Sequence, residues 1–297
     1  MRRRLLPAAG LLIAAVGAAF VVRALVRDWD EARDAITGAS AGWLVATPLL
    51  AAAGMTAIAV PWADAVRLLG GAVDRGRAVG WYFVGELGKY VPGGVWPVVG
   101  RGELLRKRGD VPGAVAYASV ALSLVALYLA AMLVAVALLP FGLAGDDDPG
   151  PALWLLLLLP AGLLALHPRP LRLAVSTLEA IARRPLDVSL PRWPAAIRLV
   201  VSYAPAWVLI AGATFSAARA LDGDAEAGRV ALAAVVSWIA GFLAVPVPGG
   251  IGVREAVFTA AAGLDPGVGA AAAVVARVAF MGVDAVGAAA GSVASSR

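Results

Sequence analysis

Apolar residues fill long runs of this chain, and most charged residues fall in short segments between those runs. Six runs approach or exceed the ~20 residues that a helix needs to cross the hydrocarbon core of a bilayer. They cover residues 5–22, 42–63, 114–139, 152–166, 197–218 and 268–293, and the fourth is the shortest. The pattern predicts an all-α polytopic membrane protein with about six transmembrane helices.

The composition agrees with this interpretation. With 61% hydrophobic and 15% charged residues, the chain has too little polar surface to coat a soluble globule. The apolar run at 5–22 is longer than the core of an ordinary secretory signal, so we expect an uncleaved first helix. The absence of cysteine excludes disulfides, thiol nucleophiles and cysteine-ligated metals.

The basic residues mark topology. Arginines follow the second run and also cluster in residues 101–108 and 167–194, whereas the acidic segment 145–150 contains none. Cytoplasmic loops of membrane proteins carry the excess of lysine and arginine. We therefore expect both termini in the cytoplasm of a cell-membrane protein, and we interpret the net charge of +5 as a topology signal, with no nucleic acid as partner.

The tetrapeptide VPGG occurs twice, at residues 91–94 and 247–250. Around the first copy, arms 78–90 and 94–105 would each reach only ~20 Å as helices, against a hydrocarbon core of ~30 Å. Since Pro92, Gly93 and Gly94 break the helix between them, we expect a re-entrant hairpin. The second copy has arms 230–244 and 251–264 with Pro246, Pro248, Gly249 and Gly250 at its tip. That pair could also span, which would give eight helices.

Each hairpin is followed by a similar sequence, GDVPGAVAYASVAL after the first and GLDPGVGAAAAVVA after the second. Three spanning helices in each half is an odd number, so the second half must be inverted relative to the first. We predict one integral membrane domain, 1–297, with repeat halves 1–139 and 152–297. Residues 167–194 form a cytoplasmic linker, in which one stripe of apolar residues (Leu171, Val175, Leu178 and Ile181) predicts an interfacial helix.

Charged residues at membrane depth are the candidates for a site, because each costs ~2.5–3.5 kcal/mol at a helix centre on insertion scales. They are Glu86, Lys89, Arg101, Glu103, Arg254, Glu255, Arg277 and Asp284. The Gly249, Gly250 and Gly252 segment would offer unpaired backbone N–H groups at a helix N-terminus, which favours an anion. Adding Arg254, Lys89 and Arg101 gives donors suited to a phosphate, with Glu86, Glu103 and Glu255 balancing the empty site. The alternative is that Arg101 with Glu103 and Arg254 with Glu255 are interfacial anchoring pairs.

Aromatic residues crowd the first hairpin and carry less information. Trp81, Tyr82, Tyr90 and Trp96 could pack around a headgroup, but interfacial belts use the same residue types. For Trp81 and Trp154 we favour the belt.

The segments LGKYVPGGVWPVVGR and PVPGGIGVREAVF resemble the two signature regions of the membrane domain of lysylphosphatidylglycerol synthases and of stand-alone flippase-like proteins. By this resemblance, the marked positions are Lys89, Pro92, Gly93, Arg101, Pro248, Gly249, Gly250, Gly252, Arg254 and Glu255. The resemblance implies a lipid-translocating domain. Because no aminoacyl-transfer domain follows the membrane part in this sequence, we do not expect it to aminoacylate lipids.

The first functional hypothesis is a flippase-like translocase for a phosphate-bearing or polyprenyl-phosphate-linked lipid, with substrate contacts from the charged residues and glycines named above. No GxxxxGK[ST] motif is present, so movement would be downhill or coupled to an ion, with Glu86, Glu255 or Asp284 as proton carriers. The second is an intramembrane lipid-phosphate enzyme. It is disfavoured because His167 is the only histidine and Asp146–Asp148 lie in an outside loop.

The third hypothesis is a non-transporting partner of a lipid-modifying or glycosyl-transferring enzyme. We expect a protein that is not an enzyme and has no cofactor and no metal, with an anionic lipid as partner. A homo-oligomer and a lipid-modifying enzyme partner stay open.

Overall fold

A computed structural model describes residues 23, 26–27, 29–91, 95–143, 154–183, 185–244 and 247–294. Every secondary-structure element in this part of the chain is helical, as predicted. The first predicted run, the tip residues Pro92, Gly93 and Gly94, Pro246 and the acidic triplet at 146–148 lie outside the described residues.

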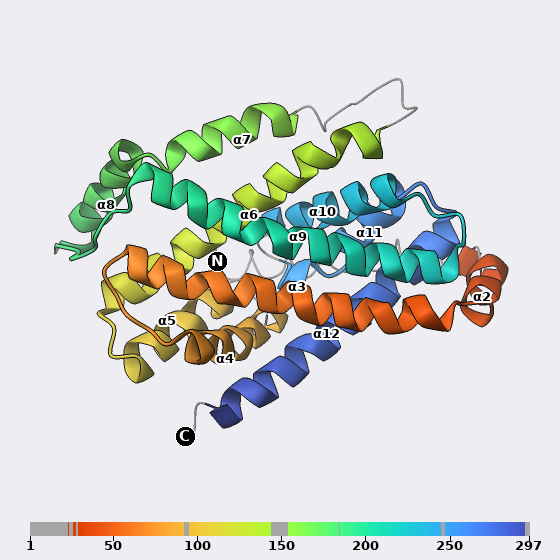
Figure 1. The fold of residues 1–297 in the computed structure, drawn as a ribbon, viewed down its shortest axis with the longest axis horizontal. Coiled ribbons are helices and arrows are strands. Elements are labelled where there is room, and N and C mark those ends of the chain that lie inside the picture. The colour runs from red at the N-terminus through yellow and green to blue at the C-terminus, as the bar shows by residue number, and fades with distance from the viewer. Residues whose placement is uncertain are drawn as a thin grey trace, which may run out of the picture.

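The helices follow one another along the chain as shown in Figure 1. Their bounds are α2 Trp29–Thr37, α3 Ala41–Leu68, α4 Arg75–Glu86, η1 Leu87–Tyr90, α5 Trp96–Arg108, α6 Gly113–Gly142, α7 Trp154–Ala165, α8 Pro168–Ala182, α9 Trp193–Leu221, α10 Ala227–Leu243, η3 Pro248–Gly250, α11 Val253–Ala261 and α12 Pro266–Ala294.

Four of the described helices, α3, α6, α9 and α12, are long and apolar enough to cross a membrane. They confirm the second, third, fifth and sixth predicted runs and make this a multi-pass membrane protein. Helix α7, within the fourth predicted run, has 12 residues and would reach only about 18 Å.

Helices α3 and α9 run side by side through the centre of the bundle (Figure 1). Small residues let them approach, because a Cβ built on Gly54 would lie 3.1 Å from Cγ1 of Ile210. The hydroxyl of Ser216 donates a 2.8 Å hydrogen bond to the carbonyl of Trp43. Trp62 and Trp207 are fully buried in the same core.

Helices α6 and α12 are packed against this centre in matching ways. Helix α4 lies against α12, and helix α10 lies against α6. At the first contact a Cβ on Gly80 would lie 3.1 Å from Cα of Gly291. At the second, a Cβ on Gly228 would lie 2.5 Å from the carbonyl oxygen of Phe141. In both places a glycine of a short helix meets the end of a long one.

The pairs α4/α5 and α10/α11 lie at opposite ends of the bundle (Figure 1). Each pair follows the predicted arms to within a few residues, and α4 continues directly into η1. The two turns contact each other near the middle of the molecule. This contact places residues of both VPGG regions at one point.

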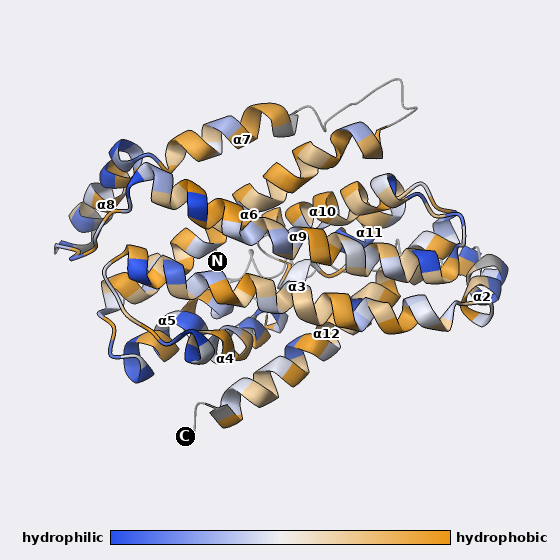
Figure 2. Ribbon diagram, viewed as in Figure 1, coloured by the Kyte–Doolittle hydropathy of each residue, from blue (hydrophilic) through white to orange (hydrophobic). Residues whose placement is uncertain are grey.

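Apolar residues dominate the long helices, while hydrophilic residues gather in α8, α5 and the connecting segments (Figure 2). The predicted linker helix is present as α8. His167 caps its N-terminus, where the Nδ1 atom of the ring accepts a hydrogen bond from the N–H of Arg169. The interfacial prediction for Trp81 is wrong. Trp81 is 2% exposed, because its ring lies where α5 ends and a Cβ on Gly109 would lie 3.2 Å from it. The side chain of Trp154 lies outside the described residues.

Candidate functional site

A cavity of about 350 Å³ lies between the two helix pairs, where η1 and η3 meet. Its wall is mostly apolar and aromatic. The aromatic residues that line it are Tyr82, Tyr90, Tyr128, Trp207, Trp238, Phe242 and Phe280. A cavity of this kind, with a few convergent polar groups, is the usual form of a small-molecule site.

Most of the charged residues predicted for the site line this one cavity. Glu86, Lys89 and Arg101 come from the first helix pair, Gly249, Gly250 and Arg254 from the second, and Arg277 and Asp284 from α12. Gly252 and Glu255 do not line the cavity, but Glu255 contacts the cavity residue Arg277 and accepts a hydrogen bond from the N–H of Gly252. The side chain of Pro248 is not described. The fold thus brings together residues that are up to 198 positions apart.

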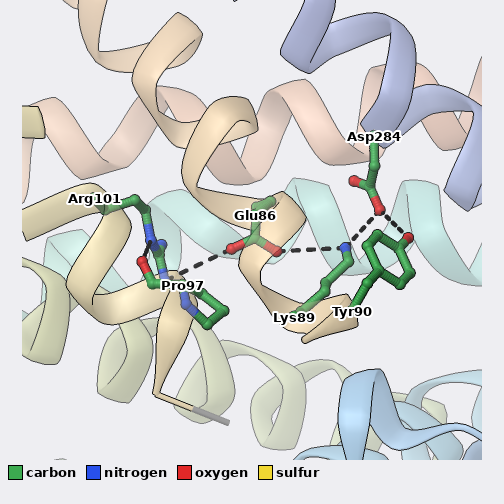
Figure 3. Close-up of polar contacts among 6 residues, drawn as sticks. All are labelled: Glu86, Lys89, Tyr90, Pro97, Arg101 and Asp284. Carbon is green, nitrogen blue, oxygen red and sulfur yellow. Dashed lines mark hydrogen bonds and ion pairs between the residues drawn. The ribbon is translucent and has the colours of Figure 1, made fainter. Parts of the chain in front are cut away.

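Ion pairs connect the first helix pair to α12 across the cavity (Figure 3). Arg101 Nη2 lies 3.6 Å from Glu86 Oε1, and Lys89 Nζ lies 3.4 Å from Glu86 Oε2. Lys89 Nζ also lies 2.7 Å from Asp284 Oδ2, which accepts a 2.6 Å hydrogen bond from the hydroxyl of Tyr90. Lys89 therefore shares its charge between two carboxylates on different helices.

Arg101 is held firmly. Its side chain is 2% exposed, its Nε donates to the carbonyl of Pro97 at 3.2 Å, and its guanidinium lies 4.8 Å from the ring centroid of Tyr82. This burial contradicts the alternative that Arg101 and Glu103 form an interfacial pair. Glu103 instead lies outside the cavity, where hydrogen bonds from Arg106 and Tyr117 lower its pKa to about 2.

Glu255 occupies the helix N-terminus that we expected to bind an external anion. Its Oε2 accepts a 2.7 Å hydrogen bond from the N–H of Gly252, the cap residue of α11, and its Oε1 lies 2.6 Å from Nη1 of Arg277. A glutamate three residues after the cap can reach back to the cap N–H. The expectation of an open backbone anion site at Gly252 is therefore corrected, since the protein's own carboxylate fills it.

Arg254 is different from the other basic residues of the cavity. Its guanidinium carbon lies 3.5 Å from the ring centroid of Trp238 and 5.3 Å from that of Phe280. Within the described residues no carboxylate forms an ion pair with it, whereas Lys89, Arg101 and Arg277 all have one. The four basic residues thus face three carboxylates, which leaves one positive charge in excess.

Glycines at η3 allow the two halves to approach at the cavity. Gly249 has φ of +55° and Gly250 has φ of +66°, a region that residues with a Cβ rarely adopt. A Cβ on Gly249 would lie 3.4 Å from Nη2 of Arg277 and 3.4 Å from the carbonyl oxygen of Lys89. A Cβ here would therefore be in van der Waals contact with both residues, and it is the positive φ that requires glycine.

Most aromatic residues of the cavity wall were not predicted from the sequence. Trp238 and Phe280 flank Arg254, and Tyr128 stacks on Phe242 with ring centroids 3.6 Å apart. These residues lie on α6, α10 and α12 within ordinary apolar runs, where nothing in the local pattern separates a cavity residue from a lipid-facing one. Their role appears only when the helices are packed.

The sequence model of the Lysylphosphatidylglycerol synthase TM region matches residues 8–291. No curated protein matches the chain. The matched range includes both VPGG segments and every charged residue of the cavity. The chain therefore belongs to the family of the lysylphosphatidylglycerol synthase transmembrane region.

Proposed function

We propose that this protein is a flippase-like lipid translocase, which takes an anionic, phosphate-bearing headgroup into the central cavity and moves the lipid between leaflets. The observation that carries the proposal is Arg254, a cation without a carboxylate partner in the described residues, on the wall of a cavity inside an apolar bundle. A charge at membrane depth is costly and is usually kept for a function. A bound phosphate would supply the missing partner.

The size and charge of the cavity support a headgroup as the ligand. A volume of about 350 Å³ lies near the lower end of the ~300–1,000 Å³ range of small-molecule sites, so it suits a headgroup with the acyl chains left outside. The single excess positive charge matches one phosphodiester. Arginine also presents paired N–H donors that fit phosphate oxygens.

We further propose that α4/α5 and α10/α11 are re-entrant hairpins of an inverted repeat. The four helices have 9 to 17 residues, about 14 to 26 Å, which is short of a ~30 Å hydrocarbon core. Their position at opposite ends of the bundle and the matching glycine contacts with α12 and α6 support this arrangement (Figure 1). Rocking of the two halves about the cavity would then expose it to each leaflet in turn.

We propose binding and transport without catalysis, in the cell membrane and with cytoplasmic termini. Glu86, Glu255 and Asp284 each form an ion pair with a basic residue, which favours a binding site for an anion over a metal centre or a free catalytic acid. A protein that only presents lipid to an enzyme would bind the headgroup but would not move it.

The test is a vesicle assay with the purified protein in phosphatidylcholine vesicles that contain an acyl-labelled phosphatidylglycerol. A membrane-impermeant quencher added outside reports the movement of labelled lipid from the inner leaflet. We expect the wild type to accelerate this movement and Arg254→Ala to slow it roughly 10- to 100-fold, the effect of losing a hydrogen bond to a charged group.

Arg67→Ala is the matched control, because Arg67 is 44% exposed and pairs with Asp64 away from the cavity. It should keep the wild-type rate. If the wild type binds the headgroup but lipid moves no faster than in protein-free vesicles, the transport proposal is wrong and lipid presentation takes its place.

A further inference from the structure

The three carboxylates at the cavity differ in how their oxygens are used. Both oxygens of Glu255 have partners, the N–H of Gly252 and Arg277. Both oxygens of Glu86 face a cation, Arg101 on one side and Lys89 on the other. Asp284 is different. Its Oδ2 forms an ion pair with Lys89 and accepts a hydrogen bond from Tyr90, while its Oδ1 is buried with no hydrogen-bond partner in the described residues.

Asp284 therefore depends on Lys89 for charge compensation. Its side chain is 0% exposed, and the distance from its Oδ2 to Lys89 Nζ is 2.7 Å. The titratable and charged side chains that share the cavity around it are Tyr82 and Glu86 of α4, Lys89 and Tyr90 of η1, Arg101 of α5, Tyr128 of α6, Arg254 of α11 and Arg277 of α12. Helices α2, α3 and α9 also pack on α12, and their described residues add no titratable group to this cavity.

Lys89 is the cation best placed to change partners. Its side chain is 21% exposed, compared with 2% for Arg101 and 14% for Arg277. It lies in a short 3-10 turn beside η3, and its ammonium is a compact charge on a flexible stem. A phosphate bound at Arg254 in the same cavity would attract it away from Asp284.

We propose that Asp284 binds a proton when Lys89 turns to the headgroup phosphate, so that one proton moves with each lipid. Without Lys89 the carboxylate would be a buried charge with only the Tyr90 hydroxyl as partner, which is strongly unfavourable. A proton from the aqueous side that adds to the carboxylate removes that charge. On the other side the phosphate leaves, Lys89 returns, and the proton is released to water. This inference rests on the proposed function and names its coupling ion.

The charge balance makes the proposal specific. One phosphodiester brings one negative charge and the proton brings one positive charge, so the loaded site has the same charge as the empty one. Transport should then respond to a proton gradient but not to a membrane potential, which acts only on net charge moved. Coupling of one proton per lipid shifts the ratio of lipid between leaflets tenfold for each pH unit.

The experiment measures the final leaflet ratio of labelled phosphatidylglycerol in vesicles. With one pH unit across the membrane, we expect the wild type to enrich the label about tenfold in the leaflet on the alkaline side. A potassium diffusion potential without a pH gradient should leave the ratio near one. Asp284→Asn should show no enrichment in either condition. The control Asp64→Asn, an exposed carboxylate at the end of α3, should behave as the wild type.

A second measurement does not depend on the folding of any variant. Glycerophosphoglycerol, the soluble headgroup, is added to detergent-solubilised wild type in weak buffer with a pH-sensitive dye, and binding is measured in parallel. We expect about one proton taken up for each headgroup bound. Binding without proton uptake, or a leaflet ratio that follows the potential and ignores the pH gradient, would overturn the coupling and leave the translocase intact. If the protein neither binds the headgroup nor moves the lipid, the proposed function itself is overturned.

Discussion

Among the single residues of the site, Glu255 has two structural roles. It caps the N-terminus of α11 through the N–H of Gly252, and it neutralises Arg277 on α12 at 2.6 Å. The carboxylate thus fixes the orientation of the helix that carries Arg254, and it leaves Arg254 as the cation in excess. Arg254, the neighbour of Glu255 in the sequence, is the residue proposed to bind the headgroup, whereas Glu255 itself is a positioning residue.

A double-mutant cycle tests this pairing. Glu255→Gln should lower the unfolding free energy in mixed micelles, because Arg277 would be left partly buried without its carboxylate. Arg277→Met should also lower it, and the double variant should lose less than the sum of the two. We expect a coupling of about 0.5–3 kcal/mol. Strict additivity would show that the 2.6 Å contact contributes nothing to stability.

At the level of the element, glycines set how closely the short helices approach the long ones. Gly228 of α10 meets the backbone of Phe141 at the end of α6, and Gly291 near the end of α12 meets Gly80 of α4. Within a bilayer, helices associate through such close packing, because lipid tails are as apolar as the helix surfaces. These contacts hold both helix pairs, and with them the cavity wall, in place.

Alanine substitutions in these contacts should destabilise the bundle. A Cβ on Gly228 would lie 2.5 Å from a backbone oxygen that cannot rotate away, so Gly228→Ala should cost about 1–3 kcal/mol, as overpacking generally does. Gly291→Ala should act in the same direction at the matching contact. Thermal unfolding followed by tryptophan fluorescence in detergent measures both.

Gly282→Ala is the control in the same helix as Gly291, since a Cβ there would have nothing within 4 Å. It should leave the unfolding temperature unchanged or raise it, because alanine is the better helix former. Equal effects of Gly282→Ala and Gly228→Ala would contradict the packing argument.

At the level of the whole molecule, the two helix pairs enter from opposite ends and meet in the middle (Figure 1). This arrangement puts the central cavity between two sets of connecting segments, 69–74 with 109–112 and 222–226 with 262–265. If the pairs are re-entrant, the two sets lie on opposite faces of the membrane.

Single cysteines can test this, because the native chain has none. In oriented membrane vesicles, Asp74→Cys and Asp110→Cys should react with an impermeant maleimide from one face, which basic residues 106–108 predict to be the cytoplasmic one. Asp224→Cys and Asp265→Cys should react only from the other face. Labelling of all four positions from a single face would contradict the inverted arrangement.

Local patterns in the sequence predicted the helical membrane class, the position of four spanning helices and the breaks at both VPGG segments. These follow from local rules: a bilayer forces backbone groups to pair within a helix, apolar length measures the span, and proline with glycine interrupts it. The charged residues of the site could be selected for the same reason, because charge at membrane depth is costly wherever the chain folds.

The contacts that those residues make depend on how the helices pack against one another. Lys89 and Asp284 are far apart in sequence and are brought to 2.7 Å by the packing of η1 on α12. Trp238 lies over Arg254 because α10 packs against α11, and Trp81 is buried because α4 packs against its neighbours. Such contacts depend on which helix faces meet, and an apolar run that is hydrophobic all round carries no sign of its facing side.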